Sequence, residues 1–80
     1  MATSYPSKFS AVPYLGIRWV VDRMHVGTAP HHVRAEMERR MASLAPADLR
    51  EAVRYALAVH ADNGKLYRAV TSGRLTRVAS

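Results

Sequence analysis

Mostly apolar residues recur along the second half of the chain at alternating spacings of four and three. These positions, which we call the ladder, are Leu49, Val53, Ala56, His60, Asn63, Tyr67 and Val70. The alternation keeps side chains on one face of an α-helix, and Ala52, Val59 and Leu66 widen that face. The pattern predicts a long helix at 46–72, whose face carries a His and an Asn where a plain core would have Leu.

The dipeptide Asn63-Gly64 is the point at which this helix would end early, because Asn-Gly commonly terminates helices or forms turns. The apolar positions after Gly64 nevertheless keep the phase of the ladder, which a turn would not preserve. A glycine inside a helix costs only ~1 kcal/mol. We therefore expect one continuous helix.

The first half of the chain predicts two shorter helices, at 11–26 and 30–44. The first of them is apolar on two sides, one with Tyr14, Ile17, Val20, Val21 and Met24 and the other with Leu15, Trp19 and Val26. Such a segment is buried between two elements or leaves an apolar patch exposed. Its β-branched residues also allow a strand, but a helix is the element that we expect here.

Turn residues separate the predicted helices. Gly27 is expected to end the first helix and Thr28 to cap the second, with Pro30 in its first turn. The second helix has an apolar stripe at Val33, Met37, Met41 and Leu44. Pro46 then suits the first position of the long helix, with Asp48 near the positive end of its dipole.

These elements predict an all-α domain in which a helical hairpin packs on one long C-terminal helix. The helical domain is expected at 11–73, between an extended arm at 1–10 and a basic tail at 74–80. With 80 residues and no Cys, the chain has neither disulfides nor a large core, since many of its apolar residues are Ala. A monomer, a dimer and a subunit bound to a partner all remain open.

The net charge of +6 favours an acidic protein surface or a polyanion as partner, although a GC-rich genome would also produce the excess of Arg over Lys. The residues predicted to contact phosphates or an acidic surface are Arg34, Arg39, Arg40, Arg50, Arg54 and Arg68. Arg50 and Arg54 lie one turn apart on the outer side of the long helix, where an ordinary solvated face is the alternative.

No residue pattern supports catalysis: the chain has no paired His and carboxylate beside a nucleophile and no Gly-rich phosphate loop. His32 and Glu36 have a spacing that could share a metal, but two ligands are too few. We expect neither an enzyme nor a metal or cofactor. The chain also has no run of ~20 apolar residues, so a soluble, cytoplasmic protein without a membrane partner is expected.

Two helices joined at Gly27-Thr28 in a basic chain invite comparison with the helix-turn-helix DNA-binding motif. The details fit poorly, since Arg23 stands where the motif has a small residue and Thr28 where it has an apolar one. Glu36 and Glu38 would also face phosphates. We assign no family.

Several apolar or polar positions are candidates for a partner interface: Leu15, Trp19, Val26, His60, Asn63 and Tyr67. Trp19 either anchors a partner or is covered by its own chain, for instance by the arm around Phe9. His60 is either a hydrogen-bonded core His or half of a register-setting, pH-sensitive pair with Asn63. The first hypothesis is a small basic interaction module that regulates or inhibits a larger partner, and the alternative is a protein that binds the nucleic-acid backbone.

Overall fold

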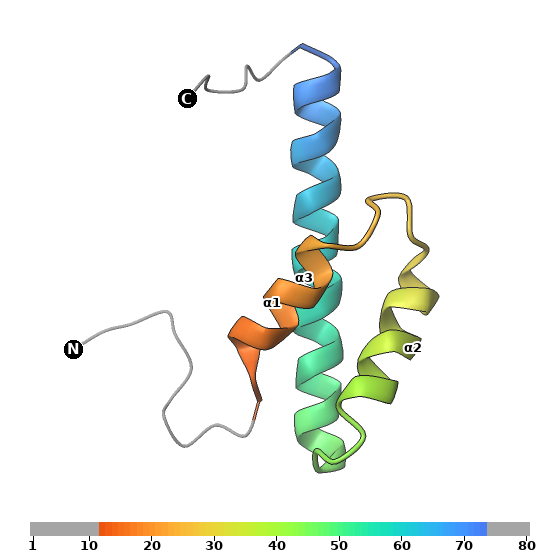
Figure 1. Ribbon diagram of the computed structural model, residues 1–80, viewed down its shortest axis with the longest axis vertical. Coiled ribbons are helices and arrows are strands. Elements are labelled where there is room, and N and C mark those ends of the chain that lie inside the picture. Colours follow the sequence, from red (N-terminus) through yellow and green to blue (C-terminus); the bar gives the residue numbers. More distant parts are fainter. Residues whose placement is uncertain (1–11, 74–80) are drawn as a thin grey trace, which may run out of the picture.

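The computed structural model describes residues 12–73, and this part of the chain consists of three helices joined by turns. Their bounds are Tyr14–Asp22 for α1, Pro30–Arg40 for α2 and Pro46–Thr71 for α3. α1 and α2 form a hairpin that packs on the N-terminal part of α3 (Figure 1). The predicted all-α class and arrangement are confirmed. The predicted arm at 1–10 and tail at 74–80 lie outside the described residues.

α3 runs through Gly64 without a break, as the phase of the ladder predicts. Ala45 is its extended N-cap residue, and Pro46 occupies the first turn, where a missing N–H costs little. Asp48 lies in the first turn, near the positive end of the helix dipole. The helix ends at Thr71, and Gly73 follows with a φ of 81°, a conformation that glycine adopts without strain.

The core lies where the hairpin meets the first part of the ladder. Its largest fully buried side chains are Ile17 and Val21 of α1 and Val33 and Met37 of α2. The matching residues of α3 are small, namely Ala52, Val53, Ala56 and Val59, so the helices approach closely but bury little volume. At one edge of this core Tyr14 stacks edge-on against Tyr55, with ring centroids 4.9 Å apart, and its hydroxyl donates to Glu51.

The last part of the ladder extends beyond the core. α1 and α2 lie beside the first part of α3, whereas the blue end of α3 in Figure 1 has no other helix next to it. Leu66 and Tyr67 are each 54% exposed there, although they share the phase of buried residues such as Val53 and Ala56. The periodicity therefore predicts the helix correctly but not the extent of its burial.

The two shorter helices end earlier than their apolar patterns predict. α1 ends at Asp22 rather than at 26, and α2 ends at Arg40 rather than at 44. Thr28 is not the cap of α2, because Ala29 is the N-cap residue and makes no side-chain hydrogen bond. Gly27 does not end α1 either: it lies in the following turn, where its N–H donates to His25 Nδ1 at 2.9 Å.

Candidate interaction surface

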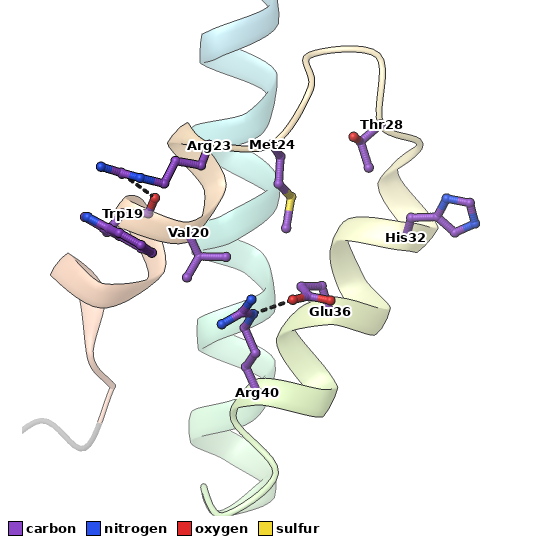
Figure 2. A pocket seen from close by; sticks show the side chains of 8 residues that line it. All are labelled: Trp19, Val20, Arg23, Met24, Thr28, His32, Glu36 and Arg40. Carbon is purple, nitrogen blue, oxygen red and sulfur yellow. Dashed lines mark hydrogen bonds and ion pairs between the residues drawn. The ribbon is translucent and has the colours of Figure 1, made fainter.

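A groove with a volume of about 440 Å³ separates α1 from α2 on the outer side of the hairpin (Figure 2). It is lined by Trp19, Val20, Arg23, Met24, Thr28, His32, Glu36 and Arg40. Val20 and Met24 also pack against the core, so the floor of this α1–α2 groove rests on the core. We take this groove and the adjoining outer face of α1 as the candidate site.

Trp19 lies at the edge of the groove and is 58% exposed. The Arg23 guanidinium lies over its indole ring, 3.8 Å from the ring centroid, and also donates to the backbone oxygen of Trp19 at 3.0 Å. A cation over an indole face is a favourable cation–π contact. Arg23 and Trp19 therefore hold one another in place on the surface. Phe9, which one of the two alternatives placed over Trp19, lies outside the described residues.

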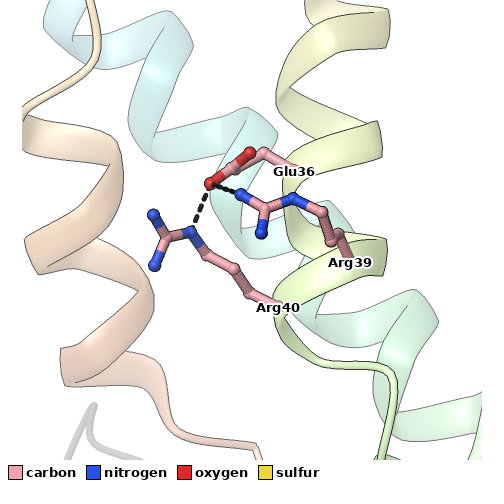
Figure 3. Close-up of polar contacts among 3 residues, drawn as sticks. All are labelled: Glu36, Arg39 and Arg40. Atoms are coloured by element: carbon pink, nitrogen blue, oxygen red, sulfur yellow. Dashed lines mark hydrogen bonds and ion pairs between the residues drawn. The ribbon is translucent and has the colours of Figure 1, made fainter.

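Glu36 forms the acidic centre of the opposite wall. Its carboxylate accepts hydrogen bonds from Arg39 at 2.7 Å and from Nε of Arg40 (Figure 3). The bonds from Arg39 and then from Arg40 hold the pKa of the Glu36 carboxyl below its usual range. Glu36 and Arg40 have the i,i+4 spacing that favours an ion pair on a helix, and two cations share the one carboxylate. Arg39 and Arg40 together outweigh the single negative charge of Glu36 on this side of α2.

The other apolar interface candidates are placed differently from one another. Leu15, one turn before Trp19 on α1, is 75% exposed, so these two residues form an apolar strip on the outer face of the helix. Val26 is half-buried in the turn after α1 and does not continue that strip. Tyr67 lies far along α3, on the part that no helix accompanies (Figure 1).

The two polar positions of the ladder bind the chain's own hairpin. His60 is buried, and its Nε2 is 2.8 Å from the backbone oxygen of Thr28 in the turn between α1 and α2. Asn63 donates to the carboxylate of Asp22 at the end of α1, at 2.9 Å. The two contacts therefore attach the turn and the end of α1 to α3. The surroundings of His60 agree with the alternative in which it is a hydrogen-bonded core His.

The six predicted Arg contacts do not form one surface. Arg39 and Arg40 flank the groove and bind Glu36, whereas Arg34 lies on the other flank of α2, beyond the buried line of Val33 and Met37. Arg50, Arg54 and Arg68 lie on the outward side of α3. The structure places Arg39 and Arg40 in a groove group and Arg50, Arg54 and Arg68 in an α3 group, and Arg34 belongs to neither.

The sequence pattern did not identify every cationic residue of these two groups. Lys65 shares the outward side of α3. It stands eleven residues after Arg54, which is close to three helical turns, and this spacing could have placed the two residues on the same side. Arg23 stands four residues after Trp19, a spacing that stacks side chains on a helix. The groove itself could not be predicted from the sequence, because its existence depends on how far apart α1 and α2 lie on α3.

Within residues 12–73, no group of His, Asp and Glu side chains is arranged to hold a metal ion. The same part of the chain has no helix that is both long enough and apolar enough to span a bilayer. His31 and His32 lie with their ring centroids 4.2 Å apart. Comparison with protein-family models, with curated proteins and with solved structures gave no match.

Proposed function

We propose that this chain is a small basic protein-interaction module, such as a regulator or inhibitor, which binds a larger protein through the α1–α2 groove. The observation that carries the proposal is the exposed position of its single Trp beside this groove. In a domain with so small a core, burying Trp19 would add more apolar area than burying almost any other side chain. Its exposed position favours a role in contact with a partner.

The chemistry of the groove is typical of protein-binding hot spots. Trp and Arg are the residues most enriched at such positions, and here Arg23 is stacked on Trp19 while Arg40 is held by Glu36. Side chains that are already fixed lose little conformational entropy when a partner binds. The apolar strip of Leu15 and Trp19 extends the contact area along α1.

The alternative function is binding to the backbone of a nucleic acid through the outward side of α3. It is favoured by the exposed Arg50, Arg54, Lys65 and Arg68, which have no carboxylate partner among the described residues. Ala58 and Ala61 leave the surface between them smooth. Such binding would weaken with salt by about one log unit per log unit of salt for each phosphate contacted.

A capture experiment with paired surface variants separates these functions. The wild-type chain, Leu15→Ser/Trp19→Ser and Arg50→Gln/Arg54→Gln are immobilised and exposed to native lysate, with and without nuclease. We expect a protein that the wild type and the Arg variant retain after nuclease treatment and that the Leu15/Trp19 variant loses. Equal retention by all three chains would contradict the groove as the binding site. Loss on nuclease treatment and in the Arg variant would establish the alternative.

A further inference from the structure

The two walls of the α1–α2 groove differ in polarity. α1 and the turn after it contribute the apolar side chains Trp19, Val20 and Met24, which Figure 2 shows along one side. α2 contributes Glu36 and Arg40 on the other side. A ligand that fills the groove must therefore be apolar toward α1 and polar toward α2.

The charged groups that remain available in the groove are cationic. Arg40 binds Glu36 through Nε, and its terminal amino groups have no hydrogen-bond partner among residues 12–73. Figure 2 shows this guanidinium directed into the space between α1 and α2. One amino group of Arg23 donates to the backbone oxygen of Trp19, and its other N–H groups remain available for a ligand. The one carboxylate of the groove, Glu36, is already shared by Arg39 and Arg40.

We propose that the groove binds an acidic amphipathic helix of a partner protein. The apolar side of this helix packs on Trp19, Val20 and Met24, and carboxylates along its flank pair with Arg23 and Arg40. A helix suits the site because residues three and four apart present an apolar stripe and a charged flank side by side. A peptide that binds by adding a strand needs a sheet edge to pair with, and the described part of the chain has no strand.

This inference rests on the proposed function, because it names the class of partner for the same groove. It is tested with a displayed library of amphipathic helices that have Leu fixed on one face and Glu, Gln or Lys at each flanking position. We expect selection on the wild-type chain to enrich Glu at the flanks. Enrichment of Gln or Lys, or no enrichment of any helix, would overturn the inference.

The most enriched helix is then synthesised and titrated against the chain, with the fluorescence of Trp19 as the signal. Because Trp19 is the only Trp, its emission reports on the groove alone, and burial by the helix should shift the emission to shorter wavelengths. Arg40→Gln and Arg23→Gln should each raise the Kd about tenfold, since each removes one charge-assisted contact. The second variant matters because Arg40→Gln also removes one of the two cations that bind Glu36, whereas Arg23 binds no carboxylate among the described residues.

Arg34→Gln is the matched control, because it removes the same charge from the other flank of α2. Circular dichroism should show the same helical content for all three variants, since these Arg side chains are exposed. An equal rise in Kd for Arg34→Gln would overturn the inference, because net charge alone would then explain binding. Tighter binding of a single-stranded oligonucleotide than of the best helix, measured through Trp19, would overturn it as well.

The two proposals fail in different ways. If the library yields no acidic helix but capture from lysate still depends on Leu15 and Trp19, the groove binds a protein of another kind. If capture does not depend on them, the proposed function itself is wrong.

Discussion

A polar side chain is stable on the buried face of a helix only when its polar atoms find partners. His60 meets this condition through the backbone oxygen of Thr28, and no buried side-chain N or O atom of the described residues lacks a partner. The bond spans two elements, because Thr28 lies in the turn between α1 and α2 and His60 lies in the middle of α3. His60 therefore fixes the position of this turn as well as filling space.

His60→Leu should lower the free energy of unfolding by roughly 1 kcal/mol, because the half-buried oxygen of Thr28 loses its partner. Burial of the apolar Leu side chain at the same site offsets only part of this loss. Urea denaturation measures the change. Asn63→Leu is the control, and its loss should be smaller because the bond to Asp22 is exposed to water. A more stable His60→Leu variant would mean that apolar burial outweighs the hydrogen bond.

The Glu36 carboxyl should titrate at a pKa below its usual range because Arg39 and Arg40 both donate to it. A pKa that is lower in the folded state than in the unfolded state stabilises the fold above the unfolded pKa. That contribution is lost as the pH falls through the folded pKa. NMR titration of the side-chain carboxyl carbon measures the pKa directly. Arg39→Gln and Arg40→Gln should each raise it, and an unchanged value in both variants would show that the bonds are absent in solution.

At the scale of the element, the length of α3 was predictable and the lengths of α1 and α2 were not. The ladder repeats often enough that its phase survives the unfavourable Gly64. α1 and α2 are short, and their apolar positions continue into the turns, where Met24, Met41 and Leu44 still pack against the core. Apolar spacing shows which residues share one side of the chain, and it cannot distinguish a helix from a turn that keeps a side chain on the same side.

The candidate site follows the same division. Exposure of Trp19 was one of two outcomes that the sequence left open, because two apolar sides on one helix do not reveal which side is covered. His60 and Asn63 stood out as polar positions, but their partners Thr28 and Asp22 lie more than thirty residues away in the chain. Periodicity within a helix carries no information about such long-range pairs.

Gly64→Ala should stabilise the protein by up to ~1 kcal/mol, because alanine has the highest helix propensity and Gly64 lies inside α3. The added methyl group would meet only the end of the flexible Arg68 side chain, at 3.4 Å. Thermal unfolding measures the gain. Gly73→Ala is the control, since its φ of 81° strains any residue with a Cβ. Destabilisation by Gly64→Ala would indicate that the helix bends at this position.

At the scale of the whole molecule, stability and exposed apolar surface are located in different places. The hairpin buries the N-terminal part of α3, and the outer face of α1 and the far end of α3 remain uncovered (Figure 1). The core of so small a domain rarely supplies more than roughly 3–5 kcal/mol of stability. Each large buried side chain therefore carries a substantial share of it, whereas the exposed apolar residues are free to serve contacts with other molecules.

Two sets of substitutions should separate these regions. Met37→Ala removes a fully buried side chain and should cost roughly 2–5 kcal/mol, enough to unfold much of the protein at room temperature. Leu66→Gln/Tyr67→Gln keeps good helix formers on the outer part of α3 and should change the free energy of unfolding by less than ~0.5 kcal/mol per site. Circular dichroism during urea titration measures both. The second result is the decisive one, because a large loss there would mean that a second copy of the chain covers this end of α3. In that case the midpoint of the wild-type transition would rise with protein concentration, whereas a monomer whose core lies only under the hairpin has the same midpoint at every concentration.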